Sequence, residues 1–322
     1  MLNAILSITL PVFILIGIGY GVARFELLSR SAGEALGQYV YVIAIPVLIF
    51  KTLSGVSLGG HSPWALWATY FGGILVAWTL GTVIIRKGFG REARAGVIGG
   101  ISAGFANTVM VGIPLVAQVY GDDGLAALLV IISVHLPIMT IVAAILMERA
   151  AATDNNAAPA PLKDQLRTIG KSLATNPLAI AIVSSVLWHM TGFPVTGIFA
   201  DVLERIAATA LPVALLSLGM SMVLYGLRGN LVPGLCLSVV KMLVMPASVF
   251  VLGAYVIQLP PLWTCVATLT AACPTGVNAF IFANKFETGH AMSTNAITVT
   301  TAAAVLTCGL WVYALELWRT AL

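Results

Sequence analysis

Residues 104–115 read GFANTVMVGIPL and residues 271–280 read AACPTGVNAF, so that glycine, proline and asparagine interrupt two long apolar runs. Pro114 has no backbone N–H, and its ring clashes with the carbonyl four residues earlier, which costs about 3 kcal/mol in a regular helix. In hydrocarbon each unpaired backbone group adds a further penalty, so an interruption persists only where it faces protein or a polar cavity. The two stretches predict a pair of broken helices inside a membrane domain.

The chain carries this pattern as part of a longer repeat. The 35-residue spacing between Pro11 and Pro46 recurs 166 residues later, and the same offset places residues 103–108 over residues 269–274. Two copies of a membrane unit, each interrupted at a corresponding depth, are typical of secondary transporters, in which the interruptions mark the binding site. The repeat therefore favours transport over catalysis.

The composition excludes a water-soluble domain. Hydrophobic residues make up 59% of the chain, charged residues 9%, and the mean hydropathy is +1.01, whereas soluble domains are roughly 25% charged. One span needs about 20 apolar residues, and hydropathy predicts an all-α membrane protein with ten transmembrane helices. Their expected bounds are 3–23, 33–53, 64–85, 94–119, 124–147, 173–191, 200–225, 231–257, 262–285 and 291–318.

The ten spans divide into two halves. Residues 1–147 form a first five-span repeat, residues 148–172 a cytoplasmic linker without assigned chemistry, and residues 173–322 a second repeat. Because five is an odd number, the second copy lies upside down relative to the first. The four cysteines show no CxxC spacing and are expected to be free thiols, so that no metal or cofactor is predicted.

The basic residues indicate the orientation. Twelve lie in the loops of one side and three on the other, with Lys241 inside the eighth span. By the positive-inside rule both termini then lie outside the cytoplasm, with the chain in the cell (inner) membrane. The net charge of +4 is thereby explained by topology and gives no reason to expect a nucleic-acid partner.

The interrupted stretches supply the candidate binding residues. Proline is favoured at the first position of a helix, so Pro274 is expected to open a second half-helix and Pro114 to do the same in the fourth span. The free N–H groups of Thr275, Gly276 and Val277 would then point at the break. Two such helix N-termini attract an anion, most simply a carboxylate. The side-chain amides of Asn107 and Asn278 add further hydrogen-bond donors.

Small residues recur at every fourth position through the first interruption and through the residues that precede it. Such a face allows another backbone to come close, and its last three members join the candidate site. The face consists of Gly96, Gly100, Gly104, Thr108 and Gly112.

Two ionisable side chains lie inside the spans and join the candidate site. Lys241 could balance an anionic substrate, pair with a carbonyl at a helix break, or extend to the membrane interface. His135 could titrate near neutral pH or be a packed core histidine. Every carboxylate lies in a loop or near the end of a span. A cation-coupled mechanism is disfavoured on this ground, because coupling ions bind oxygen ligands.

The two interrupted stretches resemble the fourth-span and ninth-span signatures of the auxin efflux carrier family, and the resemblance extends over essentially the whole chain. It implies two inverted five-span repeats, crossed fourth and ninth helices, a homodimer and an organic-anion substrate. It also implies an elevator motion of spans 3–5 and 8–10 against spans 1, 2, 6 and 7. Asn107 would contact the substrate carboxylate, with Pro114 and Pro274 shaping the crossing.

The chain differs from the plant members of that family in two ways. It lacks their long loop between spans five and six, and it has Ala106 where they usually carry proline. It is more similar to the bacterial branch, whose substrates include dicarboxylates such as malonate.

Two other functions have to be compared with this one. A sodium- or proton-coupled symporter with the architecture of bile-acid transporters would need clustered carboxylates as an ion site. Residues 100–104 match the GxSxG pattern of serine hydrolases, with Ser102 as nucleophile. That motif requires a strand-turn-helix context, whereas here it lies within an expected span, and we therefore predict that the chain is not an enzyme.

Overall fold

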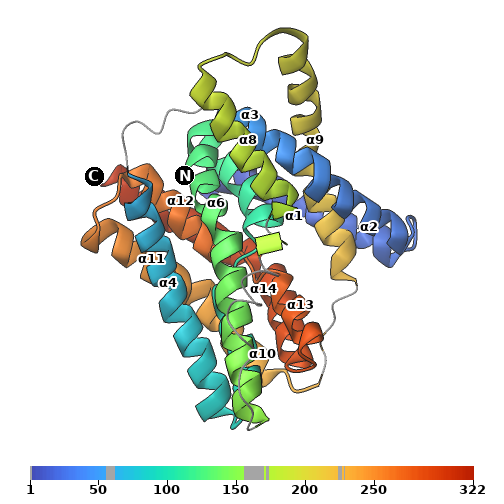
Figure 1. Ribbon diagram of the computed structural model, residues 1–322, viewed down its shortest axis with the longest axis vertical. Helices are drawn as coiled ribbons and strands as arrows, with labels where there is room; N and C mark the ends of the chain where they lie inside the picture. Colours follow the sequence, from blue (N-terminus) through green and yellow to red (C-terminus); the bar gives the residue numbers. More distant parts are fainter. Residues whose placement is uncertain (1, 56–61, 156–169, 172–173, 224–226, 228) are drawn as a thin grey trace.

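The computed structural model describes residues 2–55, 62–155, 170–171, 174–223, 227 and 229–322 (Figure 1). Within these residues the secondary structure is helical apart from one bridged pair, Ala106 and Thr275, as predicted for an all-α protein. The first half contains α1 (Leu2–Arg24), α2 (Arg30–Tyr39), η1 (Val40–Ala44), α3 (Ile45–Gly55), α4 (Pro63–Val83), η2 (Ile84–Gly88), α5 (Ala93–Gly104), η3 (Thr108–Gly112) and α6 (Ile113–Asp154). The second half contains α8 (Pro177–Thr191), α9 (Gly197–Met222), α10 (Val232–Val239), η4 (Val240–Val244), α11 (Met245–Val251), η5 (Leu252–Val256), α12 (Pro261–Ala272), α13 (Asn278–Lys285) and α14 (His290–Thr320).

Within the described residues, six helical stretches are long and apolar enough to cross a membrane. They are Arg30–Gly55, Pro63–Gly88, Thr108–Asp154, Gly197–Met222, Val232–Val256 and His290–Thr320. Leu10–Arg24, Pro177–Thr191 and Pro261–Ala272 are shorter apolar helices. The count of ten spans and the inverted relation of the halves stay predictions.

The helix α6 is twice as long as one crossing requires. It has 42 residues and bends at Gly121, whose φ of 63° and ψ of −156° are accessible to glycine and strained for other residues. The bend falls between the expected fourth and fifth spans. α6 continues to Asp154, so the first part of the expected linker is helical, whereas residues 156–169 and 172–173 lie outside the described residues.

Prolines and π-helical turns occur together at three places. η1, η3 and η4 each end two residues before a proline, namely Pro46, Pro114 and Pro246. A π-turn widens the helix by one residue, which accommodates the missing N–H and the ring of the proline. In η4 the carbonyl opposite Pro246 is that of Met242, and it accepts a hydrogen bond from Trp311 Nε1 at 2.9 Å. A proline in this setting does not break the helix.

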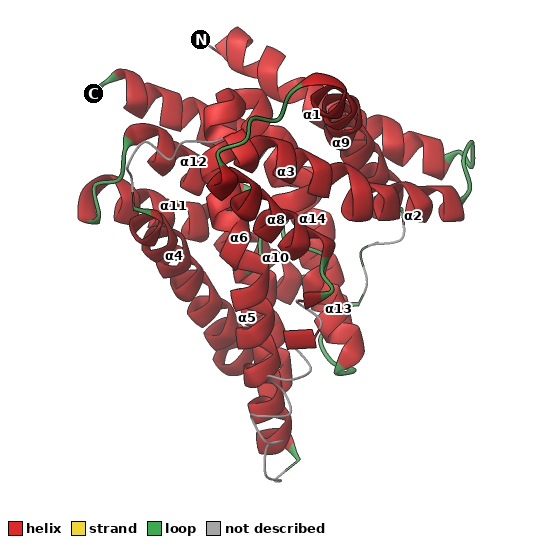
Figure 2. Cartoon of the chain, turned by 45° about the horizontal axis from the view of Figure 1, so that its top comes forward, coloured by secondary structure: helices red, strands yellow, loops and turns green. Residues whose placement is uncertain are grey.

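The helices pack in two groups. α1, α2, α3, α8 and α9 pack on one another, and α4, α5, α6 and α10 to α14 form the second group. In Figure 1 the first group lies at the upper right, α4 and α11 on the left, and α10 near the bottom. Figure 2 shows both ends of the chain at the top of the view.

The predicted small-residue face packs against α4, though its closest approach lies one residue away. A Cβ on Gly81 would stand 2.6 Å from the carbonyl oxygen of Gly99, so the two backbones are nearly in contact there. Gly100 instead faces the Trp78 ring, which a Cβ would approach to 2.5 Å. This packing brings α5 to the centre of the second group.

Candidate functional site

The two predicted interruptions meet inside the molecule. α5 ends at Gly104 and α12 at Ala272, 168 residues later, close to the repeat offset found in the sequence. Asn107 N donates to Pro274 O and Gly276 N donates to Phe105 O, each at 2.8 Å. The two broken segments therefore satisfy part of each other's backbone, as an interruption within apolar surroundings requires.

Each helix that stops at the interruption leaves carbonyl groups without helical partners. At the end of α5, Ser102 O accepts from Thr275 Oγ1 at 2.8 Å. At the end of α12, Ala271 O accepts from Lys241 Nζ at 2.5 Å and Ala272 O from Cys308 Sγ at 3.5 Å. Lys241 is fully buried. Of the roles considered for Lys241, the geometry matches pairing with a carbonyl at a helix break, and burial rules out the interface position.

The helices that resume beyond the interruptions do not begin at the predicted prolines. Asn107 is the N-cap of η3, and its Oδ1 accepts from Met110 N at 3.2 Å, so Pro114 lies several residues inside the resumed helix. Pro274 precedes α13 by four residues. It stays in the extended segment because its carbonyl accepts from Asn107 N. The two prolines therefore do not open half-helices.

Of the three N–H groups predicted to be free, two are already hydrogen-bonded within the protein. Thr275 N donates to Thr300 Oγ1 at 3.0 Å and Gly276 N to Phe105 O, so neither is available to a ligand. Val277 and Asn278 N–H donate no hydrogen bond to a described residue. The side-chain amide nitrogen of Asn107 has no partner among the described residues either. Among the described residues, the side-chain amide of Asn107 and the backbone N–H groups of Val277 and Asn278 are thus the free donors at this junction.

Burial separates the eleven candidate residues into two sets. Asn107 and Asn278 are partly exposed, whereas the other nine are buried. The buried set is Gly104, Thr108, Gly112, Pro114, His135, Lys241, Pro274, Thr275 and Gly276. These residues shape and support the junction, and only the two asparagines present a side chain to open space.

A cavity of about 210 Å³ lies beside the junction. Asn107, Met110 and Val277 line it from the second helix group. The remaining lining residues come from the first group, on α1, α2 and α9 and the residue that follows α9: Ala23, Arg30, Gly33, Glu34, Gly37, Ser217, Leu218, Met220, Ser221 and Val223. Of the predicted site residues, Asn107 alone lines this cavity. The residues on its other side were not predicted from the sequence, although the pairs Gly33/Gly37 and Ser217/Ser221, each four residues apart, are a pattern that marks them.

His135 lies behind the junction. It is buried, its Nδ1 lies 3.3 Å from Thr108 Oγ1, and its ring centre lies 5.1 Å from that of Phe105 and 5.4 Å from that of Tyr70. The Nε2 atom of His135 and the hydroxyl of Tyr70 have no partner within the described structure. His135 thus supports Thr108 at the start of η3 and does not line the cavity.

Ser102 shows no hydrolase arrangement. Its hydroxyl donates to Ile98 O of the same helix at 2.8 Å and is fully buried. The GxSxG stretch therefore belongs to the packing of α5.

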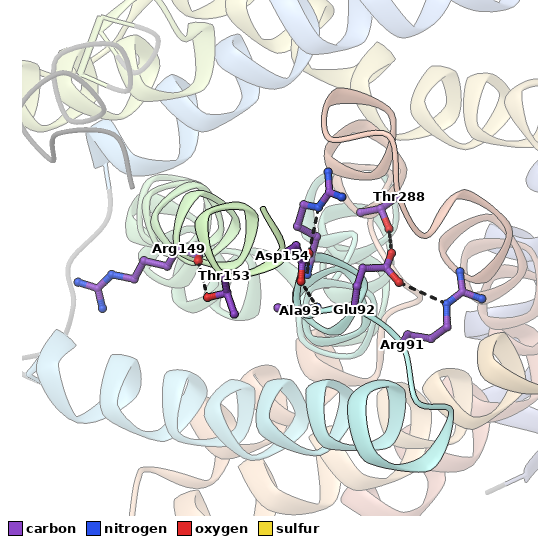
Figure 3. Close-up of polar contacts among 8 residues, drawn as sticks. Arg91, Glu92, Ala93, Arg149, Thr153, Asp154 and Thr288 are labelled. Atoms are coloured by element: carbon purple, nitrogen blue, oxygen red, sulfur yellow. Dashed lines mark hydrogen bonds and ion pairs between the residues drawn. The ribbon is translucent and has the colours of Figure 1, made fainter. Parts of the chain in front are cut away.

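A polar cluster connects the ends of the interrupted helices that lie away from the junction (Figure 3). The Asp154 carboxylate at the end of α6 accepts from Ala93 N at 2.8 Å and Arg94 N at 3.0 Å, and so caps the start of α5. Beside it, Glu92 accepts a hydrogen bond from Thr288, between α13 and α14. This hydrogen bond lowers the pKa of the Glu92 carboxyl below its usual value. The cluster thus fixes α5, α6 and the end of α13 relative to one another.

The chain is similar to known membrane transport proteins over most of its length. A family model described as "Membrane transport protein" matches residues 4–312. "Auxin efflux carrier component 8" of Arabidopsis thaliana is 23% identical, over 88% of this chain and 89% of that protein. An "Uncharacterized transporter" of Methanothermobacter thermautotrophicus is 23% identical, over 94% and 95% of the two chains. A protein of Rhizobium meliloti named "Putative malonate transporter" is 24% identical, over 94% and 93%. The chain belongs to the auxin efflux carrier family of membrane transport proteins, as its interrupted stretches predicted.

Proposed function

We propose that this protein is a secondary transporter that carries a small organic anion across the cell membrane and binds its carboxylate at the junction of the two interruptions. The observation that carries the proposal is the cavity of about 210 Å³ at the junction, into which Asn107 faces. The amide of Asn107 and the N–H groups at the start of α13 can donate to a carboxylate. The names of the Arabidopsis and Rhizobium relatives make auxin-like acids and malonate the first compounds to examine.

The packing of the helices suggests how the site changes sides. The junction belongs to one helix group and the far wall of the cavity to the other. A movement of the second group against the first would carry Asn107 and the bound anion across the membrane, which is the elevator form of alternating access. In this proposal α4, α5, α6 and α10 to α14 are the moving part, and the protein acts as a homodimer with both termini outside the cytoplasm.

The cavity also indicates which state the structure represents. Arg30 belongs to the side that carries most of the basic residues and is therefore assigned to the cytoplasm. Because Arg30 and Glu34 line the cavity, the structure would correspond to a state in which the site faces the cytoplasm.

The test is charge movement in proteoliposomes on a solid-supported membrane. Malonate, other small dicarboxylates and indole-3-acetate are applied to the wild type, Asn107→Ala and the control Asn155→Ala, an exposed residue at the end of α6. We expect a saturable current for at least one acid in the wild type and the control. Asn107→Ala should lower it at least about 10-fold, because a buried anion then loses a donor. Equal currents in all three proteins would place the site elsewhere.

A further inference from the structure

The wall of the cavity that α2 contributes carries charged side chains. Arg30, the first residue of α2, and Glu34, one turn later, are the charged residues among its described lining. Their side chains are exposed, and neither forms an ion pair with the other or with another described residue. The cavity thus presents Asn107 at the junction and an unpaired guanidinium at α2.

The position of Arg30 is unfavourable for its own helix. A cation at a helix N-terminus opposes the helix dipole, which costs roughly 0.3–1 kcal/mol at the surface. The order Arg30 then Glu34 is also the weaker arrangement of an i, i+4 pair. Ser29 already provides the N-cap, since its Oγ accepts from Ala32 N at 3.3 Å. Helix stability therefore gives no reason for an arginine here.

The surroundings of Arg30 suit a ligand with two anionic groups. Besides Asn107 and the two charged residues, the lining contains the apolar side chains of Met110, Leu218 and Met220. The hydrocarbon part of a diacid can lie against these residues while one carboxylate reaches Asn107 and the other reaches Arg30. Arginine binds carboxylates with two parallel hydrogen bonds, which gives it geometric selectivity for this group.

We propose that Arg30 binds the second carboxylate of a dicarboxylic acid whose first carboxylate lies at Asn107. This inference rests on the proposed function and narrows its substrate class from organic anions to small dicarboxylates. Arg30 is a specificity-determining residue in this scheme. Glu34 weakens the binding of the second carboxylate by repulsion and so keeps the affinity low enough for release.

The experiment compares a diacid with its monoacid counterpart. Transport of malonate and of monomethyl malonate is measured for the wild type, Arg30→Gln, Arg30→Lys and Glu34→Gln. Arg24→Gln is the matched control, because Arg24 is an exposed arginine on the neighbouring helix and does not line this cavity. We expect Arg30→Gln to raise the KM for malonate about 10-fold, the loss of one charge-assisted hydrogen-bonded contact. The KM for the monoester should change less than about twofold.

The other variants sharpen the assignment. Arg30→Lys should restore part of the malonate affinity, since it keeps the charge without the planar fork. Glu34→Gln should lower the KM for malonate and leave that of the monoester nearly unchanged. Arg24→Gln should resemble the wild type for both compounds.

The outcomes separate this inference from the proposed function. If the wild type carries malonate and Arg30→Gln shifts both compounds equally, or neither, the role of Arg30 is overturned and anion transport stands. If the wild type carries monocarboxylates alone, the dicarboxylate assignment is overturned in the same way. If no carboxylate produces an Asn107-dependent current, both proposals fail together.

Discussion

The two interruptions resemble each other in sequence but are completed by different chemistry. At the end of α5 the carbonyl of Ser102 accepts from a neutral hydroxyl, that of Thr275, which belongs to the opposite interruption. At the end of α12 the carbonyls of Ala271 and Ala272 accept from Lys241 and Cys308. These two donors lie on η4 and α14, in the second half of the chain itself.

This difference shows that a repeat can duplicate a helix break without duplicating what stabilises it. The α12 end is held from within its own half by a cation, which interacts favourably with the negative end of the helix dipole. The α5 end depends on a residue contributed by the other half. We therefore expect the end of α12 to keep its position by itself, and the end of α5 to keep its position only while the two interruptions are paired. The following predictions test this asymmetry.

The largest effect is expected from Lys241→Met. Methionine fills a similar volume but leaves the buried Ala271 carbonyl without a donor, which costs about 1–3 kcal/mol. The melting temperature in detergent and the maximal transport rate should fall together. The KM should stay within about twofold, because Lys241 does not line the cavity.

The matched control is Lys51→Met. Lys51 pairs with Glu204 at an exposed position, and such a pair contributes about 0–1 kcal/mol. A raised KM with an unchanged melting temperature in Lys241→Met would show instead that Lys241 balances the charge of the substrate.

A smaller effect is expected from Thr275→Val. Valine keeps the shape of the side chain but removes the hydroxyl that donates to Ser102 O, which should cost about 1 kcal/mol. Melting temperatures are compared with those of Thr307→Val, whose hydroxyl bonds only to Ala303 O of its own helix. If Thr275→Val lowers the melting temperature more than Lys241→Met does, the proposed order of the two helix ends is reversed.

The sequence located the junction because glycine, proline and asparagine are costly in apolar helices, and that cost is local. Asn107 could be identified for the same reason. The pairing of Phe105 with Gly276 could not, because it joins residues from different halves that the sequence leaves independent. The role of Lys241 stayed open, since a buried cation is unusual but its partner, a backbone carbonyl, has no sequence signature.

Neither Pro114 nor Pro274 opens a half-helix, and the physical reasons differ. Pro114 follows the π-turn η3 within a helix that already begins after Asn107. Pro274 lies in the extended segment, where its carbonyl accepts from Asn107 N, a partner far away in the sequence. Arg30 was counted as a topology signal, because nothing in its neighbourhood shows that the start of α2 folds against the junction.

The smallest effect is expected from the contact that connects the two interrupted helices at the ends away from the junction. Glu92, which directly precedes α5, accepts a hydrogen bond from Thr288, which follows α13, and this bond lowers the pKa of Glu92 from its ordinary value of 4.5. Because the pKa is lower in the folded protein, the contact stabilises the fold above pH 4.5. That stabilisation is lost as the pH falls through the lowered pKa.

Glu92→Gln and Thr288→Val should therefore melt slightly below the wild type at pH 7, and the gap should close toward pH 4. Solvent screens this part-exposed carboxylate, so the gap should not exceed about 2 °C. The Arg91 guanidinium, 3.6 Å away, lowers the same pKa but is more exposed, and Arg91→Gln should change the pH dependence less. A gap that widens with acid would mean that Glu92 is held in its protonated form. In that case the ionised Glu92 carboxylate would not be the group that connects the two interrupted helices.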